Sequence, residues 1–304
     1  MITINILIHV LLMLTMPPLL LGVINKTKSL FAGRVGPPLF QAYYDLAKLM
    51  RKGFVISTTT TWVFLAAPVV SLVTVALAGL LVPLGSFDAP IAFIGDAILF
   101  AYLLGLGRFF TTAAALDTGS SFEGMGAARE VTFACFSEPA LFFALLVLAK
   151  ISGSLTLTGM LHGPLGVSLQ AVSAPLILVV IGLFIILLAE NCRIPVDDPN
   201  THLELTMIHE VMVLDHGGPL LGLVLYGASL KLFVLGALFL HVAAPFQFGS
   251  AGLNWLLFIA EMLGLAVVVG MIESVMARLR MPHVPYLLIA AALFCGFGFI
   301  LLVR

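Results

Sequence analysis

Residues 219–242, PLLGLVLYGASLKLFVLGALFLHV, form an apolar run in which Lys231 is the one residue of the Asp, Glu, Lys and Arg class. About 20 apolar residues in an α-helix span the hydrocarbon core of a bilayer, because each residue adds about 1.5 Å along the helix axis. The run lacks the polar–apolar alternation that the strands of a membrane barrel require. This stretch therefore predicts a transmembrane α-helix.

The same pattern recurs along the whole chain of 304 residues, of which 61% are hydrophobic and 10% are charged, with a mean hydropathy of +1.18. The surface of a soluble domain needs far more charge than this. We predict an all-α, polytopic membrane protein that forms a single integral membrane domain over residues 1–304. Its eight expected spans lie at about 3–24, 62–83, 93–115, 131–151, 172–191, 219–242, 252–275 and 284–303.

Composition also excludes several classes of function. The formal net charge of −1 offers no basic surface for a nucleic acid. Cys135, Cys192 and Cys295 are far apart and form no Cys-x-x-Cys pair, so we expect no iron–sulfur cluster and no metal site in this chain. The first apolar run lacks a basic start and a cleavage site, and is predicted to be a retained span.

Basic residues alternate between the loops. The loops after the odd-numbered spans, residues 25–61, 116–130, 192–218 and 276–283, contain nearly all the Lys and Arg of the connections. The loops after the even-numbered spans contain none, apart from Lys150 at a span end. The positive-inside rule then places the odd-numbered loops in the cytoplasm and both termini outside.

Two of these inner loops contain local signals. In Leu39–Lys52, apolar and aromatic residues recur at helical spacing and basic residues lie towards the end, which predicts an amphipathic helix at the inner interface. The loop 116–130 is rich in glycine but lacks the Gly-Lys-Ser/Thr ending of a phosphate-binding loop. We expect its glycines to allow tight backbone turns at the membrane face.

The segment 190–218 concentrates six acids, one Arg and three His between two apolar spans. So many ionisable groups are costly unless they face water, a partner or an ion path. A hydrated loop with incidental charges is the ordinary explanation, but we favour a polar surface for docking and ion entry. His202, His209 and His216 are seven residues apart; on a helix they would form one stripe, roughly 10.5 Å between neighbours, too far apart to share one metal ion.

Charged residues also fall within the spans. Glu138, Lys231 and Glu261 would each cost several kcal/mol if they faced lipid, so each requires a partner or a water-filled path. A static buried ion pair, such as Lys231 with a Glu, is the simplest alternative. Glu190 lies at the inner end of its span, where a side chain that reaches the interface explains it equally well. Arg108 lies deeper, and the sequence leaves its role open.

Several motifs resemble, in the same order, those of the heel subunit of respiratory complex I. They are Gly33-Arg34-Val-Gly-Pro-Pro38 with Asp45 and Lys48, Gly126-Ala-Ala-Arg129 with Ser137-Glu138, and Glu190-x-x-Arg193-x-Pro195-x-Asp197-x-Pro199 followed by Glu204-Leu205. Quinone-reducing members usually have acids where this chain has Asn200 and His202. The run from residue 197 to residue 210 is instead similar to the corresponding membrane component of energy-converting membrane-bound NiFe hydrogenases, including the formate hydrogenlyase and hydrogenase-4 type.

This resemblance implies a non-catalytic subunit of an oxidoreductase complex in the cell inner membrane. It implies no cofactor in this chain, and a NiFe centre and iron–sulfur clusters on partner subunits. The implied partners are a hydrogenase large subunit and iron–sulfur small subunits on the cytoplasmic side, and antiporter-like subunits within the bilayer.

The resulting hypothesis is that the chain docks the redox arm and links its electron transfer to proton or sodium movement. Glu138, Glu190, Lys231 and Glu261 would form the ion pathway. Docking and coupling would involve loop residues Arg34, Asp45, Arg129, Arg193, Asp197, His202, Glu204, His209, Glu210 and Asp215. The alternatives are a quinone-cavity component of complex I, a stand-alone secondary transporter, which the absence of an internal repeat disfavours, and a purely structural anchor.

Overall fold

The computed structural model describes residues 2–162, 169–197, 207–246 and 248–303, and within these ranges it is helical and contains no β-strand. Two short 3-10 helices, η2 (Glu210–Val213) and η3 (Met281–His283), precede α8 and α10. The α-helices are α1 (Ile2–Phe31), α2 (Gln41–Met50), α3 (Trp62–Leu81), α4 (Asp96–Asp117), α5 (Ser121–Ser152), α6 (Leu157–His162), α7 (Leu169–Glu190), α8 (Gly218–Ala243), α9 (Ala251–Val275) and α10 (Val284–Val303).

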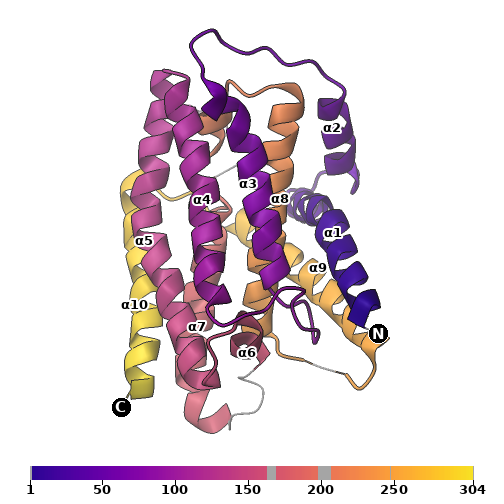
Figure 1. Ribbon diagram of the computed structural model, residues 1–304, viewed down its shortest axis with the longest axis vertical. Helices are drawn as coiled ribbons and strands as arrows, with labels where there is room; N and C mark the ends of the chain where they lie inside the picture. Colours follow the sequence, from indigo (N-terminus) through magenta and orange to yellow (C-terminus); the bar gives the residue numbers. More distant parts are fainter. Residues whose placement is uncertain (1, 163–168, 198–206, 247, 304) are drawn as a thin grey trace.

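Seven of the described helices are long and apolar enough to cross a bilayer, namely α1, α3, α4, α5, α8, α9 and the helix that includes α10. The all-α, multi-pass membrane class is therefore confirmed. In α7 the apolar stretch Ala174–Glu190 is shorter, so the count of eight spans stays a prediction. In Figure 1, α1 begins and α10 ends in the lower half, opposite the α2–α3 connection. The placement of both termini outside stays a prediction as well.

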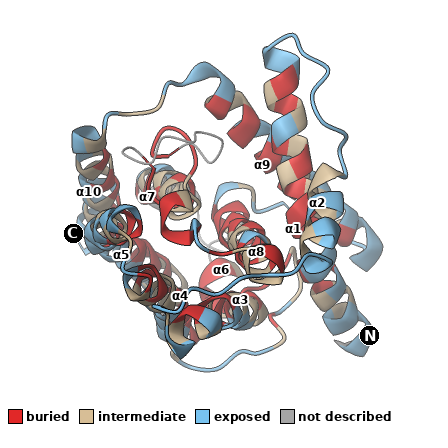
Figure 2. Ribbon diagram, turned by 90° about the horizontal axis from the view of Figure 1, so that it is seen from above, coloured by how far each residue is buried: buried red, intermediate tan, exposed pale blue. Residues whose placement is uncertain are grey.

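Helix α8 lies at the centre of the bundle (Figure 2). In α8, 67% of the apolar window is buried, against 22–44% in the other six spanning helices. Helices α1, α3, α7 and α9 pack against it, and α4, α5 and α10 pack in turn against α3 and α7. In Figure 1, α1 and α9 form a pair that is tilted relative to the other long helices. A charged side chain on α8, such as Lys231, therefore faces protein rather than lipid and needs a partner.

The amphipathic helix expected in Leu39–Lys52 is present as α2, Gln41–Met50, and none of its residues is fully buried. It packs on the outside of α1 and α8. The Tyr43 hydroxyl contacts the backbone carbonyl of Thr15 in α1. Helix α2 thereby closes one side of a space between α1 and α8 that becomes part of the candidate site.

The expected loop at 116–130 is wrong in extent, because α5 begins at Ser121 and only residues 118–120 separate it from α4. The prediction was wrong because it took Gly124 and Gly126 as turn residues, whereas both lie within the helix. The first turns of α5 pack against η2. Tertiary contact of this kind outweighs the weak helix propensity of glycine.

Gly126 is where α5 and the loop 192–218 approach closely. A Cβ added there would lie 2.9 Å from Cγ of Met212 and 3.0 Å from the carbonyl oxygen of Ile208, and would also collide with Val211. A Cβ added at Gly124, two residues earlier, meets no described atom within 4 Å. Packing therefore requires a glycine at position 126 but not at position 124.

Gly126→Ala is expected to lower the free energy of unfolding by about 1–3 kcal/mol, because the loop backbone has to move away from α5. Gly124→Ala is the matched control, and should raise stability by about 0.5–1 kcal/mol, since alanine loses less backbone entropy in a helix. Denaturation midpoints in detergent measure both. Equal behaviour of the two variants would contradict the close approach.

The predicted stripe of histidines is also corrected. His209 precedes the 3-10 helix Glu210–Val213, and His216 follows it at a turn, so the two do not share an α-helical face. His216 instead stacks on Phe64 of α3, with ring centroids 4.0 Å apart. His202 and Glu204 lie outside the described residues.

Candidate functional site

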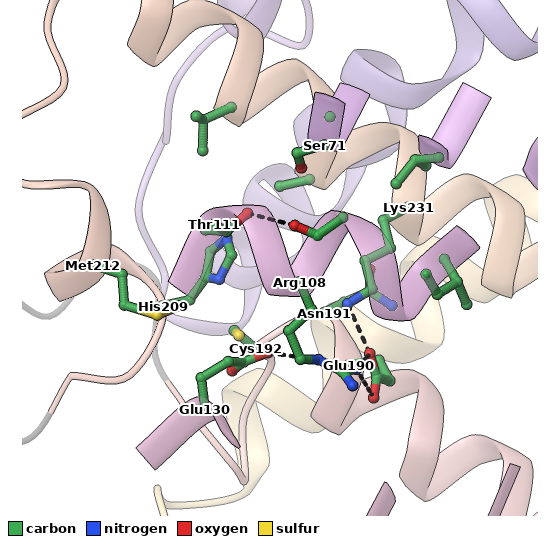
Figure 3. A pocket seen from close by; sticks show the side chains of 16 residues that line it. Ser71, Arg108, Thr111, Glu130, Glu190, Asn191, Cys192, His209, Met212 and Lys231 are labelled. Atoms are coloured by element: carbon green, nitrogen blue, oxygen red, sulfur yellow. Dashed lines mark hydrogen bonds and ion pairs between the residues drawn. The ribbon is translucent and has the colours of Figure 1, made fainter. Parts of the chain in front are cut away.

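Arg108, on α4, is the centre of a buried charged cluster (Figure 3). Its Nε lies 3.2 Å from Oε1 of Glu130, its Nη2 lies 2.6 Å from both carboxylate oxygens of Glu190, and its Nη1 contacts Oε1 of Glu138. The Arg108 side chain is 9% exposed. A guanidinium presents its N–H donors in a rigid planar fork, so one residue can bind carboxylates from two neighbouring helices at once.

Lys231, from α8, completes the cluster. Its Nζ lies 2.7 Å from Oε2 of Glu190, and the hydroxyl of Ser137 donates a hydrogen bond of 2.6 Å to Oε1 of Glu190. The ion pair of Lys231 with a Glu, which was the alternative to an ion path in the sequence-based prediction, is therefore present. The Glu190 side chain is 7% exposed, so it lies inside the bundle rather than reaching the interface.

The cluster of Glu130, Glu138, Glu190, Arg108 and Lys231 has one more carboxylate than cations. Buried charges persist only when they are paired and hydrogen-bonded, because desolvation costs several kcal/mol for each ion. One surplus negative charge makes the group a natural place for an additional proton or cation.

Glu130 of the cluster also lies close to Cys192 and His209, both from residues 192–218, the fifth inner loop, which follows the fifth predicted span. Their ligand atoms all lie within 4.8 Å of one another. Burial raises the pKa of the Cys192 thiol, and the nearby carboxylates of Glu130 and Asp197 add to this effect. Burial also lowers the pKa of His209, so both side chains are uncharged at neutral pH.

A second ion network ties the fifth inner loop to the tilted helix pair. Glu273 of α9 lies 2.8 Å from Nζ of Lys28 on α1 and 3.3 Å from Nη1 of Arg193. Asp197 lies 2.8 Å from Nη2 of Arg278. Arg193 and Asp197 are buried, so they can shape a docking surface by holding the loop in place, not by touching a partner.

The other described residues of the predicted docking set lie on α2, on α5, on η2 or on the connections between helices. Arg34 is exposed, Asp45 accepts a hydrogen bond from Gln41, Arg129 donates to the carbonyl of Met207, Glu210 opens η2, and Asp215 is exposed with its N–H bonded to Glu123. Arg34, Asp45 and Asp215 are exposed and therefore accessible to a partner, whereas Arg129 and Glu210 are half-buried.

Glu261 of α9 does not join the charged cluster. It lines a separate small cavity of about 20 Å³ together with His162 and His241. The Nε2 atom of His241 lies 2.8 Å from the carbonyl oxygen of Gly85. Of the four residues predicted for the ion pathway, the structure thus brings together Glu138, Glu190 and Lys231, and leaves Glu261 apart.

Three adjoining cavities run from the inner loops to the side of the bundle. The first, of about 260 Å³, is enclosed by α1, α2, α8 and the fifth inner loop, and Asp45, Asp197 and Glu210 line it. The second, of about 60 Å³, surrounds Arg108 and Lys231. The third, of about 490 Å³, lies beside Glu138 between α4 and α5.

The cavities share walls. Asn191, Cys192 and His209 line both the first and the second, and Arg108 and Glu190 line both the second and the third. Three adjoining spaces, separated by shared side chains that include polar and charged ones, therefore lie between the loop 192–218 and Glu138. Such a series can pass a proton or small ion between neighbouring groups.

Arg108, Glu130 and Ser137 are functional candidates that were not among the residues predicted for the ion pathway. The one signal in the sequence was the depth of Arg108 in its span, because an arginine there requires carboxylate partners from other helices. Glu130 was assigned to a loop, and the early start of α5 places it in the cluster instead.

Comparison with known proteins agrees with this architecture. A family model described as NADH dehydrogenase matches residues 3–304. The chain belongs to the NADH dehydrogenase family. Formate hydrogenlyase subunit 4 of Escherichia coli (strain K12) is 30% identical over 303 residues, which cover 96% of this chain and 94% of that protein. Hydrogenase-4 component C of the same organism is 34% identical over 238 residues, or 78% and 73% of the two chains.

A solved structure shows the same fold. A chain of the membrane-bound sulfane sulfur reductase, an archaeal respiratory membrane complex, superposes with a TM-score of 0.83 at 19% identity and covers 99% of both chains. The resemblance predicted from the motifs, to membrane subunits of the formate hydrogenlyase and hydrogenase-4 type, is confirmed by the relatives.

Proposed function

We propose that this chain is the membrane-anchoring and ion-coupling subunit of a NiFe hydrogenase complex in the cell inner membrane. It docks a cytoplasmic redox arm and links electron transfer there to the movement of protons or sodium ions. The names of its relatives support the kind of complex. The observation that carries the coupling role is the cluster in which Arg108 and Lys231 hold three carboxylates on the wall between two cavities.

The first step is the response of the loop residues to a charge on the partner. The hydrogenase large and iron–sulfur small subunits, with a NiFe centre and iron–sulfur clusters, would lie against the inner loops. A unit charge about 10 Å from a carboxylate changes its energy by about 1.7 kcal/mol at an effective dielectric constant of about 20. This is more than one pKa unit, which is enough to move a proton between neighbouring groups by linkage.

The second step is transfer through the charged cluster. Because Glu130, Glu138 and Glu190 exceed the cations by one charge, a proton or Na⁺ arriving from the first cavity neutralises the group. Arg108 and Lys231 can then pair with the carboxylates that remain ionised. The cations thus distribute the charge without leaving the cluster.

The exit lies at Glu138, whose side chain is 49% exposed on the flank of the bundle. Tyr102 and Phe109 beside it are exposed as well, and they line the same cavity. A half-exposed carboxylate on an apolar flank is costly in lipid, even with Arg108 in contact. This supports a neighbouring antiporter-like membrane subunit that covers Glu138 and accepts the ion.

Purification of the complex from its native membrane in mild detergent tests the proposal. We expect nickel, iron and a NiFe large subunit to copurify with this chain. A chain that is isolated without iron-containing partners would contradict the proposal, and active ion transport by that isolated chain would identify it as a secondary transporter.

The first cavity favours one second candidate, a quinone-cavity component of the complex I type. Its position under α2 and the fifth inner loop places a ligand-sized space next to the docking surface. Its volume of about 260 Å³ is just below the range for small-molecule sites, roughly 300–1,000 Å³. Copurified flavin and quinone, together with turnover that a quinone-site inhibitor blocks, would identify the chain as a quinone-cavity component.

Glu261→Gln is expected to slow coupled ion movement by about tenfold, equivalent to about 1.4 kcal/mol on the barrier. The effect is limited because Glu261 belongs to the separate cavity with His162 and His241. Ion uptake by vesicles measures the rate, and redox turnover measured in parallel shows whether coupling is affected. An unchanged rate would remove Glu261 from the pathway.

A further inference from the structure

We propose that Glu130, Cys192 and His209 form a binding site for a divalent transition-metal ion of the zinc type. The residues come from three parts of the chain that are 62 and 17 positions apart in sequence, so no local motif predicts the site. The fold alone brings the three side chains together. The expectation that this chain has no metal site rested on sequence spacing, and spacing does not report such contacts.

The geometry fits a metal of this kind. The three ligand atoms lie within 4.8 Å of one another, one from each side chain. Bonds of about 2.0–2.3 Å from zinc to oxygen, nitrogen and sulfur place neighbouring ligands about 3.4–3.7 Å apart in a tetrahedral site. Side-chain rotations that contract the group by about 1 Å would therefore close it around an ion.

The choice of ligands points to zinc rather than magnesium or calcium. A thiolate and an imidazole are borderline-soft ligands, whereas the two hard cations prefer oxygen ligands alone. The second cavity reaches all three residues and offers room for a water as the fourth ligand. Figure 3 shows Cys192 next to Glu130, with His209 on the facing side of the same space.

The surrounding charge also matches a divalent ion. The charged cluster has one surplus negative charge. Binding of the ion to the thiol releases its proton to water and leaves a thiolate, which adds a second negative charge. An ion of charge +2 then makes the whole group neutral, in place of the proton or Na⁺ that the cluster takes up when no such ion is bound. Glu130 can contribute to the site because Arg108 contacts Oε1 and the other oxygen remains for the metal.

The backbone at Cys192 gives a matched test variant. Cys192 has φ of +50°, the left-handed conformation, and it closes the C-terminus of α7 with an Arg193 N–H bond of 2.8 Å to the Leu188 carbonyl. Glycine is the residue most suited to this position at a helix end. Cys192→Gly therefore removes the thiol while favouring the native backbone, so a loss of binding would not arise from misfolding.

The test is zinc binding by the full chain purified in detergent. Wild type, Cys192→Gly, His209→Asn and the control Cys135→Ser, an exposed cysteine on α5, are incubated with zinc chloride and desalted. We expect about one zinc per chain in wild type and in Cys135→Ser, and at least tenfold weaker binding in the other two variants. Cobalt(II) should give a thiolate-to-metal absorption band in wild type that Cys192→Gly lacks.

Either of two results would overturn the site. One is wild-type protein that retains no zinc after desalting. The other is Cys192→Gly that retains as much zinc as wild type, or shows the same cobalt spectrum. Neither measurement depends on a redox partner, so the metal site can fail while the proposed coupling function stands.

Discussion

Replacing Arg108 with Met is expected to lower the free energy of unfolding by about 3–5 kcal/mol, the cost of leaving buried charges without a partner. Met preserves much of the side-chain volume, so the loss is electrostatic and not a cavity effect. The carboxylate of Glu190 would keep Lys231 and Ser137, but Glu130 would lose its contact with the guanidinium. We expect lower amounts of folded chain in the membrane and an earlier denaturation midpoint in detergent.

A charge-balanced variant separates electrostatics from packing. Arg108→Met leaves one cation against three carboxylates, whereas Arg108→Met combined with Glu130→Gln restores one surplus negative charge and keeps the pair of Lys231 with Glu190. The double variant should therefore recover part of the lost stability. Lys150→Met, at an exposed span end, is the control and should change stability by less than about 0.5 kcal/mol. An Arg108→Met chain as stable as wild type would show that the cluster holds no net pairing energy.

Replacing Glu138 with Gln is expected to abolish coupled ion movement while the complex still assembles. The amide has nearly the shape of the carboxylate and can still contact Arg108, but it cannot accept a proton or a cation in the same way. Because Glu138 is the half-exposed end of the cavity series, no other described residue of the cluster replaces it on that flank. Redox turnover should fall in membranes where electron transfer is tightly coupled to ion movement. It should persist where that coupling is released.

Ion uptake into vesicles and copurification of partner chains measure the two parts of this prediction. Asp88→Asn is the control, because the Asp88 side chain is 83% exposed and lies outside the three adjoining cavities. It should leave both transport and assembly unchanged. Normal ion uptake by Glu138→Gln would remove this residue from the pathway, and loss of assembly would assign it a structural role instead.

Hydropathy was sufficient to predict the positions of helices that face an apolar environment along their whole length. The predicted span 219–242 corresponds to α8, and the predicted amphipathic segment Leu39–Lys52 contains α2. The start of α5 was missed by ten residues because Gly124 and Gly126 argue locally for a turn. Contacts with the fifth inner loop, which are remote in sequence, override that local preference.

For the charged residues too, the sequence predicts one part and only helix packing decides the other. A buried charge must have a partner, and for that reason composition and span position sufficed to predict partners for Glu138 and Lys231, which the structure places with Glu190 in one cluster. Their role in an ion pathway stays a prediction. Composition could not say that Arg108 would bind Glu138 and Glu190, nor that Glu261 would lie apart with two histidines. Membrane class and the cost of charge are properties of each segment in its solvent, and so they can be read along the chain. Pairing is a property of distances between α4, α5, α7 and α8, and those distances exist only once the helices have packed.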